Sequence, residues 1–361
     1  MKFSKELKKS SKAAKVQESK KSSDVKSQDK SKKRLDLSSM KDNLSWSEAL
    51  RALVIMLPTL IFAIFGSLSL AVPLGQAGFF FSTIPLIQRR PQRLILGGIV
   101  ATIGLGFYLM GGNVVFNPFV SIGFTFFIAL NLALLVSWEL TGMLAFTFFT
   151  IYSAGLNASS AEKVHDTFLM FLLAIVWGAT VSLFKFWKTS PAMPKPQVTI
   201  IQQINTGLRL GLGTSVALAV ANIFSFGKFG WAPSAVSNVV RFDENTSRKR
   251  AVGRLIATLG GVAIAAVLLS IFFNYTYVLL VLGVLLAVLN GLFRNTKLGQ
   301  IPLLYTATIL LLYSLTDLTN SRTLMLERIG YNVIGVLIGL FVVIFPFPYL
   351  SKRLRAKYLP K

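Results

Sequence analysis

The sequence opens with a long polar stretch and then becomes a series of apolar segments separated by short polar loops. Most of these segments approach the roughly 20 residues that an α-helix needs to cross the hydrocarbon core of a membrane. The pattern predicts an all-α polytopic membrane protein with about twelve transmembrane segments. The expected segments span residues 49–70, 71–87, 94–112, 116–137, 138–156, 166–187, 205–225, 229–240, 251–273, 275–293, 299–316 and 324–347.

The two sets of six segments predict an internal duplication. Each set has an even number of segments, so both sets begin on the same side, and the repeats are expected to be parallel about an axis along the membrane normal. We therefore expect a substrate path on that axis. The recurring pairs are Arg51 with Arg209 and, at spacings of 156 and 157 residues, Thr102 with Thr258 and Phe116 with Phe273.

Changes in composition divide the chain into five parts. Residues 1–45 carry fourteen Lys and Arg against six acidic residues, and they contain too few bulky apolar side chains to fold alone. We predict a disordered basic cytoplasmic tail, which either only fixes orientation or also contacts anionic lipid headgroups. The other parts are a first six-segment membrane repeat at 46–187, a cytoplasmic linker at 188–204, a second repeat at 205–347 and a basic cytoplasmic tail at 348–361.

The second segment of each half is unusual for a helix that faces lipid. Residues 71–87 contain Pro73 and Pro85, and residues 229–240 offer barely twelve positions and include Pro233. Such backbone is tolerated at membrane depth only where it is buried in protein or lines a water-filled cavity. We therefore expect both segments beside a transport path, or alternatively packed as re-entrant elements without function.

The high positive charge of the chain could reflect either its membrane topology or the binding of nucleic acid. The 38 Lys and Arg against 14 Asp and Glu give a net charge of +24, which in a soluble protein would suggest nucleic acid. Only 14% of the residues are charged and 53% are hydrophobic, which excludes a soluble domain of this size. With the amino tail placed in the cytoplasm, 31 of the 38 basic residues fall on that side, as expected for a membrane protein. We predict that both termini are cytoplasmic and that no nucleic acid is bound.

Several classes of site are excluded by the residue types. The chain has no cysteine and a single histidine, His165, so we expect neither thiolate nor two-imidazole metal sites, and no cofactor. Nucleotide-binding loops and nucleophile elbows do not occur, so the chain is not expected to be an enzyme. The first apolar segment begins only near residue 49, which does not fit a secretory signal.

Ionisable residues inside the apolar segments are few, and each is costly in lipid and therefore a candidate for function. Arg209, Arg254 and Arg328 lie in different segments of the second half, and guanidinium groups suit bidentate recognition of a carboxylate. If the three converge, they form an anion site. Arg250 lies one helical turn before Arg254 and shares its face. Alternatively, Arg254 only snorkels to the inner membrane interface.

Proton-driven transport would need a group that changes protonation as access switches. Glu327 and Glu139 are the main candidates, with His165 and Asp166 at an outer boundary. Because Glu327 directly precedes Arg328, the two could instead form a buried ion pair.

Three motifs of the second half resemble a known family. They are the pattern R-x-x-x-R-x-x-x-T-x-x-G formed by Arg250, Arg254, Thr258 and Gly261, the preceding Trp231-Ala232-Pro233, and Glu327-Arg328 followed by Asn332 and Gly335. Over residues 205–346 the chain resembles the fusaric acid resistance or aromatic acid exporter family of integral membrane proteins. The resemblance implies an exporter of organic anions in a bacterial inner membrane, and it adds Arg250 and Trp231 to the candidate substrate-binding residues. Larger members carry a substantial cytosolic domain, which the short linker here does not provide.

We therefore predict a transporter that exports organic, and by resemblance aromatic, carboxylate anions, with proton coupling left open. Two alternatives remain. One is an anion channel lined by arginine, and the other is an envelope-assembly protein without any flux of its own. The expected partners are the organic anion and, at the basic tail, anionic lipids, and a homo-oligomer is left open.

Overall fold

The computed structural model describes residues 44–65, 67–84, 98–135, 139–157, 161–184, 187, 199–224, 227–296 and 302–345. By their contacts, residues Met1–Leu44 form a unit separate from Ser45–Lys361, and every helix below belongs to the second unit. The predicted amino tail apart from residues 44 and 45, residues 188–198 of the predicted linker and the predicted carboxyl tail lie outside the described residues.

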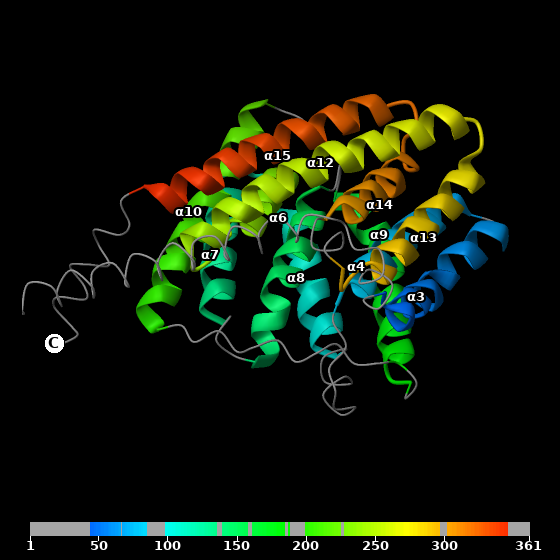
Figure 1. Cartoon of the computed structure of the whole chain (residues 1–361), viewed down its shortest axis with the longest axis horizontal. Helices are drawn as coiled ribbons and strands as arrows, with labels where there is room; N and C mark the ends of the chain where they lie inside the picture. The colour runs from blue at the N-terminus through cyan, green and yellow to red at the C-terminus, as the bar shows by residue number, and fades with distance from the viewer. Residues whose placement is uncertain are drawn as a thin grey trace, which may run out of the picture. The chain divides into compact units, whose positions relative to one another are not determined.

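The described part of the second unit is helical, as the apolar pattern predicts (Figure 1). Each of the predicted apolar segments corresponds mainly to one α-helix, although the first, 49–70, also includes the first three residues of α4. A short π-helical segment, η1, precedes α6. In chain order the helices are α3 (Trp46–Phe65), α4 (Leu68–Ser82), η1 (Val100–Gly104), α6 (Leu105–Val114), α7 (Pro118–Leu135), α8 (Glu139–Leu156), α9 (Ala161–Ser182), α10 (Ile200–Phe224), α11 (Trp231–Val239), α12 (Glu244–Phe272), α13 (Thr276–Leu292), α14 (Leu303–Ser314) and α15 (Ser321–Ile344).

The helices differ in their ability to cross a membrane. Within the described residues, four are long and apolar enough to do so: α3, α10, α12 and α15. Other apolar helices are shorter, and α11 has only nine residues, which rise about 14 Å against a hydrocarbon core of about 30 Å. Helix length and composition therefore support four crossings among the described residues, and the count of about twelve stays a prediction.

Local sequence explains where two of the central helices begin. Pro233 is the third residue of α11, in the first turn, where a missing backbone N–H costs no helical hydrogen bond. Asp243 caps α12, since its side chain accepts a hydrogen bond from the backbone N–H of Thr246 at 2.7 Å. Pro233 thus favours the start of α11, and Asp243 fixes the start of α12.

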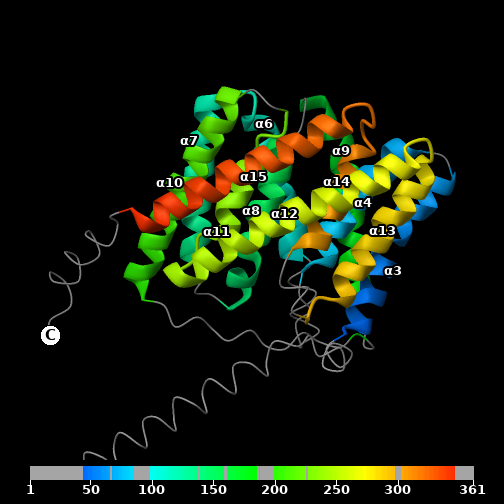
Figure 2. The same ribbon diagram turned by 45° about the horizontal axis from the view of Figure 1, so that its top comes forward.

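Most helices pack along one particular partner helix. α7 lies along α10 and α3 lies along α13, at opposite ends of the bundle (Figures 1 and 2). In the first half α4 packs on α9 and α6 on α8, while in the second half α11 packs on α15 and α12 on α14. Between these pairs α4 contacts α14, and α8 contacts α11. Helices α4, α8, α11 and α14 therefore meet where the two halves of the chain come together.

Small residues allow several of these pairs to approach closely. A Cβ placed on Gly335 of α15 would collide with the carbonyl oxygen of Ala232 in α11, and one on Gly261 would lie 2.6 Å from Cβ of Thr306 in α14. Gly253 is an exception, because nothing lies within 4 Å of its Cβ position. Gly207 and Gly211 face α7 in the same way, and Gly339 faces α11.

Candidate functional site

A polar cavity of about 180 Å³ lies where the two halves meet. Its volume is similar to the ~150 Å³ of an apolar cavity that holds benzene, so a small organic anion would fit. Among the described residues, its lining offers hydroxyl, amide and guanidinium groups but no carboxylate or imidazole. The lining residues are Phe80, Thr83, Thr150, Ile151, Asn238, Arg254, Pro302 and Tyr305.

The two unusual short segments both contribute to this lining. Phe80 and Thr83 come from the end of α4, and Asn238 comes from the end of α11. The prediction that residues 71–87 and 229–240 lie beside a cavity is therefore confirmed for these side chains. Their part in transport remains a prediction.

A second pocket, of about 20 Å³, adjoins the first. Both are lined by Phe80, Thr150 and Tyr305, but the smaller one is lined by Arg328 and Trp231 in place of Arg254. A pocket of this size has room for about one water molecule. Since Trp231 begins α11 and Asn238 lies near its end, the two cavities follow each other along the length of α11.

Arg254 is held by a neutral partner. Its side chain is 3% exposed, and its Nε donates a hydrogen bond to Oδ1 of Asn332 at 2.9 Å. Nδ2 of Asn332 in turn donates to the carbonyl oxygen of Arg328 at 2.7 Å. None of the salt bridges among the described residues includes Arg254. The guanidinium is therefore fixed against α15 rather than extended toward a membrane surface. No described carboxylate neutralises its charge.

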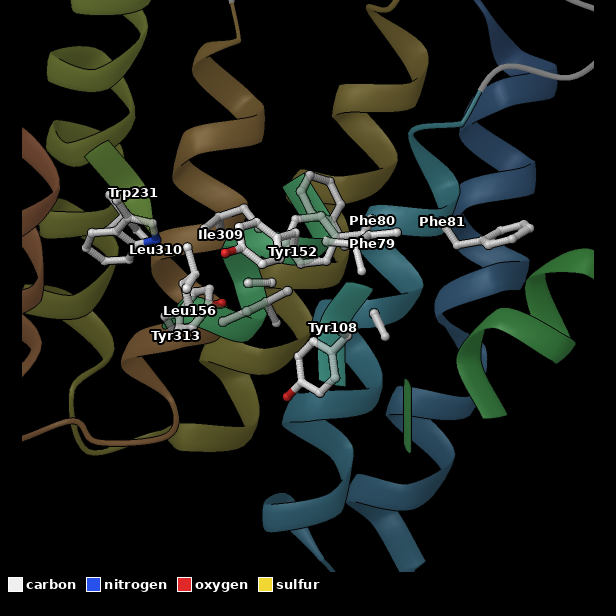
Figure 3. Close-up of a cluster of buried hydrophobic side chains, with 14 of the residues drawn as sticks. Phe79, Phe80, Phe81, Tyr108, Tyr152, Leu156, Trp231, Ile309, Leu310 and Tyr313 are labelled. Carbon is white, nitrogen blue, oxygen red and sulfur yellow. The ribbon is translucent and has the colours of Figure 1, made fainter. Parts of the chain in front are cut away.

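Arg328 lies against aromatic rings. Its guanidinium carbon is 4.8 Å from the ring centroid of Trp231, a distance at which the cation is attracted by the ring face. Trp231 also makes an edge contact with Tyr313. The Nε atom of Arg328 is buried and has no hydrogen-bond partner among the described residues. Figure 3 shows Trp231 and Tyr313 at one side of an aromatic cluster that reaches Phe79, Phe80 and Phe81 at the other.

Glu327 and Arg328 do not form the ion pair that their adjacency suggested. Within the described residues no salt bridge joins them, because consecutive helical residues point in different directions. Oε1 of Glu327 instead accepts a hydrogen bond from the backbone N–H of Gly227 at 3.2 Å, and its Oε2 has no described partner. Glu327 does not line either cavity.

The other predicted residues lie elsewhere. Arg209 is buried in α10 and lines neither cavity. Arg250 is exposed near the start of α12. Of the three arginines expected to converge, only Arg254 and Arg328 therefore approach the cavities. Glu139 is the first residue of α8 and Asp166 lies in α9, but both side chains are outside the described part, and His165 is exposed.

Several lining residues were not identified from the sequence. Phe80 and Tyr305 are aromatic residues in apolar segments, where such residues are usually core, and nothing in their spacing distinguishes them. Thr150 and Asn238 are polar residues within apolar helices, a weak signal that applies to many other positions. Asn332 belonged to a motif, but its contact with Arg254 joins segments 78 residues apart.

A cluster of three charged side chains lies at the end of α4, around the backbone of the lining residue Thr83. Arg51 bonds Glu48 at 2.6 Å and also donates to the carbonyl oxygens of Ser82 and Ile84. Arg294 donates to the carbonyl oxygen of Thr83 at 2.8 Å and lies 3.3 Å from Glu48. The carboxyl end of α4 is therefore held by two cations, which suit the negative end of a helix.

Comparisons with known proteins bear on the second half of the chain. No curated protein and no solved structure matches the chain. Residues 216–342, which include Trp231, Arg254, Tyr305 and Arg328, match the family described as fusaric acid resistance protein-like. This match confirms the resemblance inferred from the motifs between residues 205 and 346. The chain thus carries a fusaric acid resistance protein-like domain over residues 216–342.

Proposed function

We propose that this protein is a transporter that exports organic carboxylate anions across a bacterial inner membrane, with both termini in the cytoplasm. The fusaric acid resistance protein-like domain supports a transport function and includes both arginines of the cavities. Aromatic carboxylates are the favoured substrates, because aromatic rings accompany the guanidinium groups.

One observation carries this proposal. Arg254 and Arg328 are each 3% exposed, line adjoining cavities and form no salt bridge among the described residues. A buried cation without a counter-ion is costly, and an anionic ligand would offset that cost. The carboxylate of a substrate is thus the group that the site lacks.

The packing supports two parallel six-helix repeats. The fourth helix of each half lies along the first helix of the other half, as α7 with α10 and α13 with α3. The second helix of each half packs on the sixth, as α4 with α9 and α11 with α15. In both of these pairs a glycine makes the close contact, Gly178 against Phe81 and Gly335 against Ala232, and the two glycines are 157 residues apart. The cavities then lie on the two-fold axis.

An anion channel is the second candidate, and one feature favours it. Among the described residues, neither cavity is lined by a carboxylate or a histidine, so no proton carrier lies on the path itself. Glu327 is the main described candidate for coupling; it is the residue next to Arg328 and would have to act from outside the cavity wall.

Flux measurements in proteoliposomes separate the two candidates. Labelled benzoate should accumulate against its own gradient when a pH gradient is imposed at zero membrane potential. Glu327→Gln or Glu139→Gln should abolish this uphill movement but spare exchange, if either residue carries the proton. Benzoate flux that only follows its electrochemical gradient would favour the channel, and no flux of any organic anion would contradict both.

A further inference from the structure

The two buried arginines do not face the same space. Arg254 lines the cavity of about 180 Å³, and Arg328 lines the pocket of about 20 Å³. Each arginine has its own fixed surroundings, since Arg254 bonds Asn332 and Arg328 lies over Trp231. A single carboxylate held by both guanidinium groups would need both to reach one cavity.

The boundary between the cavities consists of the three residues that line both, Phe80, Thr150 and Tyr305. Phe80 is the bulky apolar member, and it comes from α4 whereas Tyr305 comes from α14. These two helices belong to different halves of the chain and contact each other. The boundary therefore lies at the junction of the halves, where a relative movement of the halves would change its width.

Phe80 also borders a third pocket, which is apolar. This pocket lies behind the boundary and is lined by Phe81, Ile84 and Ile151 beside Phe80 itself, together with Ala77, Phe171 and Ile175. The free space there is only about 10 Å³, so the Phe80 ring can move in that direction only if its apolar neighbours shift with it. Figure 3 shows Phe80 beside Phe79, with Phe81 lying farther toward α3.

We infer that Arg254 and Arg328 form two anion subsites in series and that Phe80 is the size-selecting residue between them. This inference rests on the proposed transport function. An anion binds first at Arg254, where there is room for it, and passes Phe80 to reach Arg328. The smaller pocket has room for about one water molecule, so it must widen before the second subsite is occupied.

The test measures flux of acetate, benzoate and 2-naphthoate in proteoliposomes, and benzoate binding to the purified protein by calorimetry. Phe80→Ala should raise the ratio of 2-naphthoate flux to acetate flux about tenfold, and Phe80→Trp should lower it similarly, each corresponding to about 1.4 kcal/mol. Benzoate binding should remain measurable in both, since Arg254 is untouched and still offers its guanidinium to the cavity. Phe81→Leu is the matched control, because Phe81 borders only the apolar pocket.

A second pair of variants tests the order of the subsites. Arg254→Gln should weaken benzoate binding by about one to two decades, whereas Arg328→Gln should preserve binding and reduce flux. Equal loss of binding in the two variants would mean that both arginines hold one anion, and the inference would be overturned. An unchanged flux ratio in folded Phe80→Ala, or in Phe80→Trp if the alanine variant does not fold, would overturn it as well. Absence of any anion flux in the wild type would overturn the transport function itself.

Discussion

Asn332 accepts a hydrogen bond from Nε of Arg254 at 2.9 Å, across the interface between α12 and α15. The partner of this buried cation is a neutral amide, so it does not offset the positive charge of the guanidinium. The bond uses Nε, which leaves the two terminal nitrogens for other partners. An aspartate at the same place would provide the same acceptor but neutralise the charge. The choice of a neutral partner thus preserves an electrostatic attraction for anions.

The contribution of Arg254 to binding can be measured directly. Arg254→Ala removes a charge-assisted hydrogen bond worth about 1.5–3 kcal/mol, so benzoate affinity should fall by about one to two decades. Arg254→Lys should recover only part of this, because a point charge cannot reproduce the planar fork. Calorimetry on purified protein provides the measurement, with Arg248→Ala as a control on the same helix, since Arg248 is exposed. Equal affinities for wild type and Arg254→Ala would exclude Arg254 from the site.

The buried ion pair between Arg51 and Glu48 should stabilise the folded protein. Arg51 and Glu48 are 1% and 8% exposed in their side chains, and removing one partner of a buried pair costs about 3–5 kcal/mol. Arg51→Gln should therefore lower the unfolding midpoint strongly in detergent. The matched control is Arg248→Gln, which breaks an exposed pair with Glu244 and should cost no more than about 1 kcal/mol. Similar midpoints for the two variants would contradict the structural role of Arg51.

Close packing of α12 on α14 predicts opposite effects for two glycines of the same helix. Gly261→Ala would place Cβ 2.6 Å from Cβ of Thr306, and such overpacking costs about 1–3 kcal/mol. Gly253→Ala meets nothing within 4 Å, so the better helix propensity of alanine should stabilise the protein by up to about 1 kcal/mol. Thermal unfolding of the two variants provides the comparison. A stable Gly261→Ala variant would mean that the two helices separate more easily than the contacts indicate.

The cap of α12 should depend on pH. Hydrogen bonds from the side chain and backbone of Thr246 lower the pKa of Asp243 below its ordinary value of 3.8. A carboxylate whose folded pKa is depressed stabilises the folded state fully above its unfolded pKa, and that contribution is lost as the pH falls through the folded pKa. The protection factors of the amides in the first turn of α12, which correct for the pH dependence of intrinsic exchange, should therefore fall on acidification below about pH 4. Asp243→Asn should keep the cap but remove this dependence, and an unchanged pH profile would refute the assignment.

Thiol labelling in intact cells tests the orientation. The chain has no cysteine, so single cysteines can be introduced without background. Asn245→Cys lies at an exposed position in the basic stretch before Arg254, and Arg322→Cys lies at an exposed position at the start of α15. The basic loop that contains residue 245 is predicted to face the cytoplasm, whereas residue 322 lies in a loop on the predicted outer side. An impermeant reagent should therefore label residue 322 and not residue 245. Labelling of residue 245 from outside would invert the proposed topology.

Much of the fold and part of the site could be predicted from the sequence. The helices follow from apolar runs that are punctuated by local signals such as Pro233 and Asp243, because the start and end of a helix depend on neighbouring residues. The cost of charge in an apolar segment singles out Arg254 and Arg328, and it also singles out Arg209. The sequence therefore determined which residues were candidates without separating the members of the site from the others.

Only the tertiary structure decided which candidates share a cavity. Arg209 and Arg254 are alike in sequence, but α10 packs along α7 whereas α12 packs on α14 and α15, so only Arg254 meets Tyr305 and Asn332. Glu327 and Arg328 are adjacent, yet they point to different neighbours. The direction in which a helix turns each side chain is set by contacts between segments far apart in the chain. Local periodicity carries no information about those contacts, and the composition of the site therefore emerges only when the two halves are packed together.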